Sequence, residues 1–479
     1  MKTLVGIDVG TSGTKALVMH DDGVVTRRAT AEYPLSTPHP GWAEQDPTDW
    51  WAAVETVLGQ VGGTRDVDAI GLTGQMHGAV FLDANGDVVR PAMLWNDQRT
   101  ERECAQIDEI VGASRVRAIT WNPPLTGFQL PKLLWLRTHE PAAFARVRSV
   151  LLPKDYIRFK LTGERITDVA DASGTGLLDI AKRTWSTEML EALDLDPSLF
   201  PRVVESGEVA GVTRDGVPIA AGAGDQAAAG VGTGTVRPGI VSVCLGTSGV
   251  VFTALDALPA GPTEQAQTFC HANGRWHVMA VMLSCGGAVR WLRDTMYPGV
   301  SYDDITADAD SVSPGADGVT FLPYLTGERS PHNDPRATGA FCGLTVRHTR
   351  AHLARAVFEG VTYGLLDGLD VLRGTGVAPT QLRLTGGGAV SPFWRQLIAD
   401  VTGTPCVTLS CDEGPGYGAA LLAGVAANIW PTIADACDAV IHIHHTTEPR
   451  GGDSASRYAT AARAYRELYP HLRAWGRAS

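Results

Sequence analysis

The first 35 residues alternate between apolar and polar positions, a pattern typical of β-strands. In TLVGIDVG, this period of two places Val5, Ile7 and Val9 on one face of a strand. The opposite face carries Gly6 and Asp8, so one carboxylate stands on a bare surface that could face a ligand. The runs TKALVMH and VVTRRATAEYP continue the pattern and are separated by a DDG turn. We therefore expect a three-stranded meander.

A helix and a fourth strand follow the meander. Asp46 and Pro47 are residue types preferred at the N-cap and in the first turn, and the helical pattern continues to about Leu58. The run VDAIGLT then predicts a buried strand. Because this order combines hairpins with a crossover, it predicts an α/β domain whose sheet is mixed rather than purely parallel.

The sequence from about Gly239 onward repeats this organisation in outline. GIVSVCLGTSGVVFTAL and RWHVMAVML predict three strands, and HTRAHLARAVFEGVTYGLLDGLDVL has the spacing of a long helix. The strand QLRLT, a glycine run, a helix from about Ser391, the strand CVTLS and the helix GAALLAGVAANI follow, and a surface helix is expected after about Glu448. Both halves begin with strand, GTSG and strand. We therefore expect a duplicated architecture with domains at residues 1–236 and 237–479.

The repeated tetrapeptide GTSG occupies residues 10–13 and 246–249. Glycine lets the backbone approach a ligand closely, and successive backbone amides form a concavity that binds anions. Asp8 precedes the first copy by two positions, whereas Cys244 precedes the second, so only the first copy offers a charge to a cation such as Mg²⁺. Each copy alone also fits a simple hairpin turn. Two copies at corresponding places favour phosphate binding.

The charge and composition of the chain limit the kinds of molecule that it can bind. The 479 residues carry a formal net charge of −12, which opposes binding to nucleic acids and anionic membranes. No run of about 18 apolar residues predicts a membrane span, and MKTLVGIDVG reaches a carboxylate too early for a secretory signal. The 8 cysteines lie far apart, which favours free thiols in a reducing cytoplasm. The cluster of His442, His444 and His445 lacks a nearby carboxylate or thiol, so we expect no metal there.

Five stretches together resemble the FGGY carbohydrate kinases, a branch of the actin-like, ribonuclease-H-like ATPases. They are GIDVGTSGTK, GLTGQMHGAV, GAGDQAAAG, PYLTGERSPHNDP and LTGGGAVSPFWRQLIADVTG. The resemblance implies an α/β fold of two ribonuclease-H-like domains, with mixed sheets flanked by helices and an active site in the cleft between them. GQMHG and GERSPHNDP are most similar to the family members that phosphorylate xylulose. Gln129 and Gln226 depart from the family's pattern.

Asp225, in AGAGDQAAAG, is the residue that the resemblance implies as the catalytic base. Phosphoryl transfer to an alcohol needs a group that accepts the hydroxyl proton, and no bulky neighbour in this stretch would crowd a sugar. The alternative role of Asp225 is the N-cap of the helix QAAAGV. The two roles are compatible, because a helix N-terminus favours an ionised carboxylate.

The resemblance implies further site residues. Asp8 would position Mg²⁺ through water, and Met76 and His77 would contact the sugar together with Asp225 and Gln226. Met76 adds an apolar wall without charge, which favours a neutral sugar over an aldonate. Trp95, Asn96 and Asp97 in LWNDQR are expected to border the same pocket. ATP would contact the two GTSG turns and a glycine run, namely Gly10, Thr11, Ser12, Gly246, Thr247, Ser248, Gly386, Gly387 and Gly388. For the glycine run, a tight strand-to-helix turn without a ligand stays open as an alternative.

The expected activity is the ATP- and Mg²⁺-dependent phosphorylation of D-xylulose. Ribulokinase, gluconokinase and glycerol kinase activities are the alternatives within the family. An actin-like ATPase that uses nucleotide only to change shape is an alternative from another class, although such a protein needs no sugar pocket. A sugar-sensing regulator would need a basic helix-turn-helix segment, which the sequence does not show. The oligomeric state is open, with a homodimer as one expectation.

Overall fold

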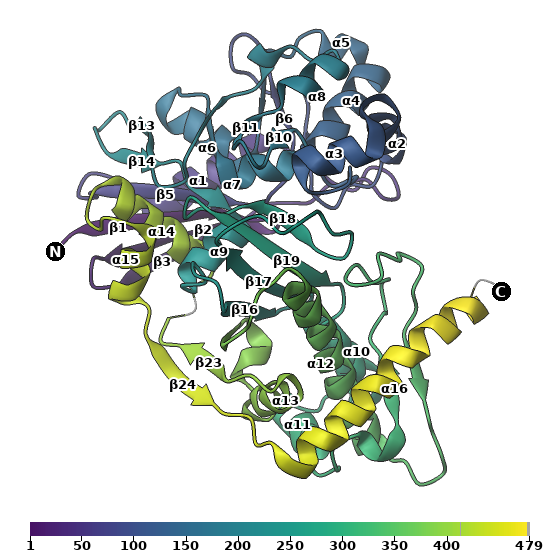
Figure 1. Ribbon diagram of the computed structural model, residues 1–479. Helices are drawn as coiled ribbons and strands as arrows, with labels where there is room; N and C mark the ends of the chain where they lie inside the picture. The colour runs from purple at the N-terminus through teal and green to yellow at the C-terminus, as the bar shows by residue number, and fades with distance from the viewer. Residues whose placement is uncertain (412, 477–479) are drawn as a thin grey trace.

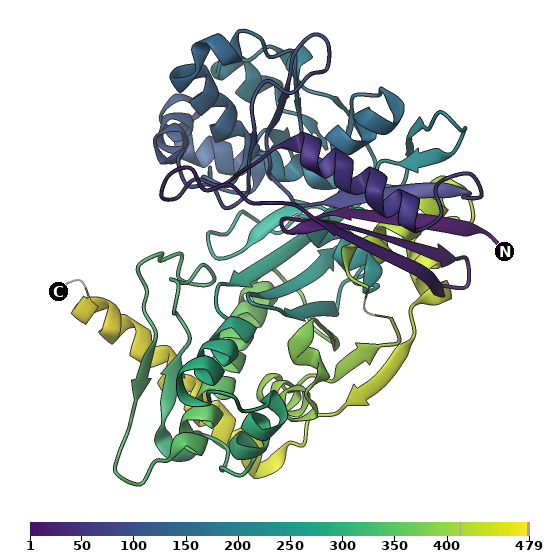
Figure 2. The ribbon, with the colours of Figure 1, turned by 180° about the vertical axis from the view of Figure 1, so that it is seen from behind.

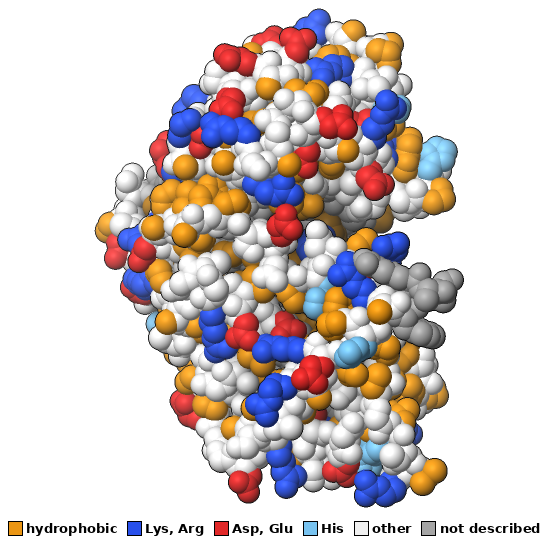
Figure 3. Space-filling model, turned by 45° about the vertical axis from the view of Figure 1, so that its right-hand side comes forward, with side chains coloured by type: hydrophobic (Ala, Val, Ile, Leu, Met, Phe, Trp, Pro, Cys, Tyr) orange, Lys and Arg blue, Asp and Glu red, His pale blue; other side chains and the backbone are white. Residues whose placement is uncertain are grey.

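The computed structural model describes residues 1–411 and 413–476 and consists of two lobes (Figures 1 and 2). Each lobe is built on a seven-stranded sheet. The amino-terminal lobe fills the upper part of Figure 1 and the carboxy-terminal lobe the lower part. Seen in space-filling form, the surface is hollowed between the two lobes on one side (Figure 3).

The first sheet contains the expected meander and the expected crossover strand. Its strand order is β13-β14-β5-β1-β2-β3, and β15 also pairs with β5. Since β1 pairs antiparallel with β2 and parallel with β5, the sheet is mixed, as predicted. The strands are β1 (Thr3–Val9), β2 (Gly13–His20), β3 (Val25–Glu32), β5 (Ala69–Gly74), β13 (Val209–Val212), β14 (Pro218–Ala220) and β15 (Ala223–Gly224).

One face of this sheet is covered by helices α1 (Pro47–Gln60) and α6 (Pro153–Thr162). Helix α1 begins as the sequence predicts, because the Asp46 side chain accepts a hydrogen bond from the Thr48 backbone N–H at 2.9 Å. Trp50 of α1 is fully buried against the sheet. This face is the core that the alternating pattern of β1 predicts.

The other face is covered by helices α9 (Asp225–Gly232), α14 (Pro415–Ala426) and α15 (Ile433–Val440). Helix α14 belongs to the last part of the sequence, yet it lies directly on β1 and β5 (Figure 1). A Cβ atom at Gly6 would stand 1.9 Å from the carbonyl oxygen of Gly416 in α14. The expectation that Gly6 faces a ligand is therefore wrong, since this glycine makes room for a helix backbone. The domain boundary between residues 236 and 237 stays a prediction, although α14 and α15 lie beyond it in sequence.

The second sheet has the order β18-β19-β17-β16-β22-β23-β24 and is also mixed. The predicted long helix forms as α12 (Arg350–Gly374). The expected tail helix also forms as α16 (Gly452–Gly476), but it buries Tyr458 and Tyr465 in the core of the lobe instead of lying wholly on the surface. The strands are β16 (Ile240–Leu245), β17 (Gly249–Leu255), β18 (Gln267–Cys270), β19 (Trp276–Met282), β20 (Thr320–Leu322), β21 (Ala340–Cys342), β22 (Gln381–Thr385), β23 (Cys406–Leu409) and β24 (Ile443–Thr447). The helices are α10 (Gly286–Met296), α11 (Tyr302–Asp310), α12 (Arg350–Gly374), α13 (Pro392–Thr402) and α16 (Gly452–Gly476).

A mainly helical region between β5 and β13 caps the first lobe at the top of Figure 1 and has its own apolar core. Its helices are α2 (Glu101–Ile107), α3 (Ala113–Thr120), α4 (Gln129–His139), α5 (Pro141–Phe144), α7 (Val169–Ala172) and α8 (Thr187–Ala192). Short strands complete the lobe, namely β4 (Glu44–Gln45), β6 (Val80–Leu82), β7 (Ala92–Met93), β8 (Ser149–Leu151), β9 (Ile166–Asp168), β10 (Leu178–Asp179), β11 (Thr184–Trp185) and β12 (Arg202–Val204). The alternation of apolar and polar residues did not single out this region.

Two general expectations can be compared with the structure. The structure shows no disulfide bond among the described residues. Within the described ranges, no helix is both long enough and apolar enough to cross a bilayer.

Candidate active site

Asp8 and Asp225 approach each other at the carboxyl ends of three parallel strands. Asp8 on β1 and Ala223 on β15 both pair with Thr73 of the intervening strand β5. Asp225 follows Gly224, the last residue of β15, so the two carboxylates flank the end of β5. The two carboxylates also interact electrostatically, since the charge of Asp8 raises the pKa of Asp225. Ligands of open α/β sheets bind at this end of the strands.

Asp225 is the first residue of α9, and the N-cap residue of that helix is Gly224. The alternative role of Asp225 as the N-cap is therefore wrong. Burial, and then the charge of Asp8, raises the pKa of Asp225 from 3.8 to about 7, against the lowering effect of hydrogen bonds with Gln226. We expected the helix N-terminus to keep this carboxylate ionised, but the loss of hydration on burial has the larger effect and raises its pKa. Asp225 consequently titrates close to neutral pH, which suits a general base.

Asp8 has the features of a cation ligand. Burial raises its pKa from 3.8 to about 6, and the exposed Lys15, its partner across the β1–β2 hairpin, opposes this only in part. The buried atom Asp8 Oδ1 has no hydrogen-bond partner in the described structure. Hard divalent cations bind such carboxylate oxygens, so the site fits Mg²⁺ held by Asp8, directly or through water. The part of the chain that the structure describes contains no group of three His, Cys, Asp or Glu residues suited to a metal, which leaves water and phosphate oxygens as the other ligands.

The first GTSG turn is held by buried amide side chains. Gln45 donates a hydrogen bond to the backbone carbonyl of Thr11 at 2.7 Å, and Gln75 donates to the Gln45 side chain at 3.0 Å. The Thr11 hydroxyl donates to Gln75 at 3.2 Å and accepts from the Trp95 indole N–H at 3.0 Å. Thr11 is therefore engaged within the protein. Ser12 is exposed and is the hydroxyl of this turn that is open to a ligand.

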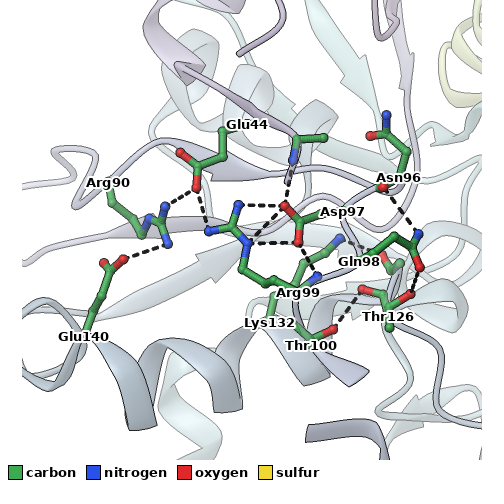
Figure 4. Close-up of polar contacts among 12 residues, drawn as sticks. Glu44, Arg90, Asn96, Asp97, Gln98, Arg99, Thr100, Thr126, Lys132 and Glu140 are labelled. Carbon is green, nitrogen blue, oxygen red and sulfur yellow. Dashed lines mark hydrogen bonds and ion pairs between the residues drawn. The ribbon is translucent and has the colours of Figure 1, made fainter. Parts of the chain in front are cut away.

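The LWNDQR segment places Trp95 beside this turn. Arg99 lies 2.6 Å from Asp97 and 2.7 Å from Glu44, and its guanidinium stands 3.5 Å from the centre of the Trp42 ring (Figure 4). Asp97 is fully buried in this network, so the expectation that it borders the sugar pocket is wrong. The network fixes the backbone next to Trp95, which is 43% exposed.

His77 has a neutral ring with a defined tautomer. Its Nδ1 lies 2.6 Å from the carbonyl oxygen of Gly174, and because a carbonyl only accepts, Nδ1 carries the hydrogen. Burial lowers the pKa of His77 to about 3, and the charges of Lys132 and Arg329 add to this effect. Nε2 is therefore a hydrogen-bond acceptor. The backbone of His77 is left-handed, with φ of 68°, which is uncommon for a residue other than glycine.

Two buried polar side chains support the backbone around His77. Gln129, the residue that departs from the family's pattern, donates to the carbonyl of Gly78 at 3.1 Å. Lys132 donates to the carbonyl of His77 at 2.9 Å, and burial lowers the pKa of Lys132 to about 7. Met76 is 4% exposed and packs beside His77. A histidine acceptor next to an apolar side chain suits a ligand that carries hydroxyl groups on a carbon chain.

The second GTSG turn docks on the start of α10. The carbonyls of Gly246 and Thr247 accept hydrogen bonds from the backbone N–H groups of Gly286 and Gly287 at 2.8 and 3.0 Å. Thr247 is exposed and Ser248 is half-buried, so both residues are accessible from solvent. In the first turn, the N–H of Gly10 is used within the hairpin, where it donates to the Gly13 carbonyl at 3.1 Å.

The glycine run at residues 386–388 forms the tight turn between β22 and α13. Gly386 has φ of 78°, and a Cβ atom there would stand 3.1 Å from the Leu245 backbone. A Cβ atom at Gly388 would stand 2.6 Å from the Trp394 ring, whereas one at Gly387 would meet no described atom within 4 Å. The packing thus accounts for two of the three glycines, and Gly387 is the one open to a ligand. His442, His444 and His445 are exposed, around β24.

Two cationic residues beside the site escaped the sequence reasoning. Lys15 stands opposite Asp8 across the first hairpin. Arg329 comes from the second lobe, is half-buried, and lies close enough to His77 to lower its pKa. Both residues belong to stretches that carry the family resemblance, GIDVGTSGTK and GERSPHNDP, and this context was the available signal.

Comparisons with known proteins agree with this arrangement. Residues 3–232 match the model for the N-terminal domain of the FGGY family of carbohydrate kinases, and residues 241–427 match the model for its C-terminal domain. The xylulose kinase of Escherichia coli strain K12 is 44% identical over 439 residues, which cover 88% of this chain and 90% of that protein.

Two solved structures share the whole fold. One is a xyloylose kinase from Brucella ovis, with 40% identity and a TM-score of 0.93 over 99% of this chain and 100% of that one. The other is a xylulose kinase from Rhodospirillum rubrum, with 30% identity and a TM-score of 0.92 over the same shares. These likenesses confirm the expected fold class, two actin-like α/β domains with mixed sheets flanked by helices.

Proposed function

Because the chain belongs to the FGGY family of carbohydrate kinases, we propose that it transfers the terminal phosphoryl group of ATP to the 5-hydroxyl of D-xylulose. The observation that carries the proposal is the pairing of Asp8 with Asp225 at one end of the first sheet. The relatives described above, which are named as kinases of xylulose, support the choice of sugar.

Asp225, in its ionised form, accepts the proton of the attacking hydroxyl. The sugar oxygen forms a bond to the γ-phosphorus while the bond from that phosphorus to the ADP oxygen breaks. The products are D-xylulose 5-phosphate, ADP and one proton, which Asp225 returns to solvent. General-base help of this kind contributes about 10²–10⁴-fold to the rate. The carboxylate pKa of about 7 keeps the base ionised in a large fraction of molecules at neutral pH.

The sugar is oriented by the neighbouring side chains. The neutral His77 ring offers Nε2 as an acceptor to a sugar hydroxyl, and Met76 forms an apolar wall. Gln226, which follows the base and is half-buried, adds an amide on the same side. Holding the hydroxyl in line with the phosphate supplies a large part of the rate enhancement. Closure of the two lobes would then exclude water that otherwise hydrolyses ATP.

The nucleotide phosphates are expected between the two GTSG turns, near the Ser12, Thr247 and Ser248 hydroxyls. Asp8 would hold Mg²⁺, which, when bound, neutralises phosphate charge. Lys15 lies opposite Asp8 and adds positive charge on the same hairpin.

D-gluconate is the alternative substrate for which the structure offers a specific argument, the position of Arg329. An aldonate needs a cation for its carboxylate, and the Arg329 guanidinium lies near His77. A coupled assay of ADP release with D-xylulose, D-ribulose, D-gluconate and glycerol separates the candidates. We expect the highest kcat/KM for D-xylulose and loss of turnover in Asp225→Ala with ATP binding retained. Equal or better turnover of another acceptor overturns the choice of sugar, and ATP hydrolysis that no sugar stimulates indicates an actin-like ATPase.

The remaining expectations concern the setting of the reaction. We expect the enzyme to act in the cytoplasm. Because all its reactants are small molecules, we expect it to need neither a nucleic acid nor a membrane as a partner. The homodimer stays a prediction, and sedimentation of the purified protein measures it.

A further inference from the structure

A sealed cluster of charged side chains lies beneath the sugar site. The ammonium group of Lys154 stands 2.6 Å from Asp155, 2.8 Å from Asp168 and 3.2 Å from Asp171, and all four side chains have no exposed surface. Arg158, also without exposed surface, stands 2.6 Å from Asp155. Burying this many charges is expensive, and burial without exposure excludes direct contact with substrate. The role of the cluster must therefore be something other than substrate binding.

The cluster is attached to the short segment that leads into Asp225, which consists of residues 221–224 and includes β15. Arg158 donates to the backbone carbonyl of Ala221, two residues before β15 begins at Ala223. The side chain of Asp171 touches the same segment further along, since a Cβ atom at Gly224 would stand 2.9 Å from Asp171 Oδ1. Asp225 is the next residue. The cluster thus contacts the segment that leads to the base at two points, Ala221 and Gly224.

The cluster is also attached to His77. Asp168 caps α7, because its Oδ2 accepts hydrogen bonds from the backbone N–H groups of Ala170 and Asp171 at 2.8 and 3.3 Å. The chain that leaves α7 reaches Gly174, whose carbonyl accepts the hydrogen bond from His77 Nδ1. The position of the His77 ring therefore depends on where α7 is held.

We infer that Lys154 is a positioning residue for phosphoryl transfer, which holds Asp225 through β15 and His77 through α7 in one mutual geometry. Lys154 is the group that joins the two attachments. It contacts Asp155 of α6, and it also contacts Asp168, the N-cap residue of α7, and Asp171 within α7. A shift of either attachment moves the base relative to the sugar hydroxyl. Displacement by about 1 Å can lower a rate about 100-fold.

The charges of the cluster indicate how Asp171 contributes. Lys154 and Arg158 supply two positive charges against three carboxyl groups, and Asp171 lies farthest from Lys154. Burial raises the pKa of Asp171 well above its ordinary value, in line with a neutral carboxylic acid. Asp171 therefore acts by its shape against Gly224 rather than by its charge. A neutral side chain of the same shape should replace it, and a smaller one should not.

The first experiment compares Lys154→Met with Arg355→Met. Arg355 forms a similarly buried ion pair with Glu359 at 2.6 Å, but in the second lobe, so its loss serves as the control for destabilisation. Kinetics are measured below both melting transitions and scaled to the fraction of chains that bind ADP. We expect Lys154→Met to lower kcat by about 100-fold and to raise KM for the sugar, with KM for ATP unchanged. Equal kcat values in the two variants overturn the inference.

The second experiment compares Asp171→Asn with Asp171→Ala and does not depend on the folding of Lys154→Met. We expect kcat close to that of the unmodified enzyme in Asp171→Asn and a fall of about tenfold in Asp171→Ala, again with KM for ATP unchanged. The same kcat in both variants contradicts a positioning role. The inference rests on the proposed base, so both experiments use the sugar of the panel that the unmodified enzyme turns over best. Failure with D-xylulose alone then refutes the proposed substrate and not the role of Lys154.

Discussion

Replacing Asp225 by asparagine should stabilise the ligand-free protein at alkaline pH while it removes activity. In the folded protein, the pKa of Asp225 is about 7 because of burial and the charge of Asp8, whereas its ordinary value is 3.8. The folded state therefore favours the protonated form. The stability that this preference contributes is complete below pH 3.8 and is lost as the pH rises through about 7. Asparagine stays neutral and avoids this loss.

The magnitude follows from the difference between the two pKa values. One pKa unit corresponds to about 1.4 kcal/mol, so a difference of about three units sets an upper bound of about 4 kcal/mol at pH 8. Because the Asp225 side chain is only half-buried, solvent screening reduces this figure, and we expect about 2 kcal/mol. This corresponds to a rise in Tm of roughly 2 °C, because the unfolding entropy of the 479 residues is about 1 kcal/mol/K. Near pH 4 the difference should almost vanish.

Thermal unfolding of the ligand-free protein at several pH values measures this effect. The matched control is Asp303→Asn, which removes an exposed carboxylate from the first turn of α11. That change should lower stability slightly, by at most about 1 kcal/mol, because it loses a favourable interaction with the helix N-terminus. If Asp225→Asn has the Tm of the unmodified protein, or a lower one, at pH 8, the burial and charge argument for this carboxylate is refuted.

Three further predictions follow from the same site and fold. The kcat/KM for the sugar should fall about tenfold per pH unit below about pH 7, because protonated Asp225 cannot accept a proton, and a pH–rate profile measures this; a flat profile down to pH 5 contradicts the assignment of the base. Asp8→Ala should raise the Mg²⁺ concentration needed for half-maximal rate without changing sugar binding, as a Mg²⁺ titration and calorimetry with the sugar would record. Gly6→Ala should lower Tm by several degrees, since its Cβ would overlap the Gly416 carbonyl; calorimetry that shows an unchanged Tm contradicts the close packing of α14.

Most of the regular elements were predictable because each is encoded by a local pattern. The alternation of β1 and the capping residues of α1 act over a few positions, and both elements form where expected. The role of Gly6 was not predictable in this way. A residue without a side chain is required at this position because α14, about 400 residues away in sequence, packs against it. No local sequence pattern indicates that contact.

The candidate site shows the same limit. Asp8 was found because it is the lone carboxylate on one face of a strand beside a glycine-rich turn, whereas Asp225 was found through the family resemblance. The structure brings the two residues together. The protonation of Asp225 was misjudged, since hydration is lost to neighbours from other segments. Lys154 was not identified at all. It is surrounded by ordinary helix sequence, and its importance appears only when carboxyl groups from three elements, α6, β9 and α7, converge on it.

The placement of α14 on the first sheet has a consequence for synthesis on the ribosome. When residue 236 has emerged, the sheet still lacks the helix that covers Leu4 and Met19, and its apolar side faces water. The missing helix ends at residue 426, about 190 positions later, which corresponds to roughly 10–40 s at ~5–20 residues per second. The nascent amino-terminal half therefore stays incomplete and open to chaperones until translation is nearly finished, and the two halves must mature together rather than one after the other.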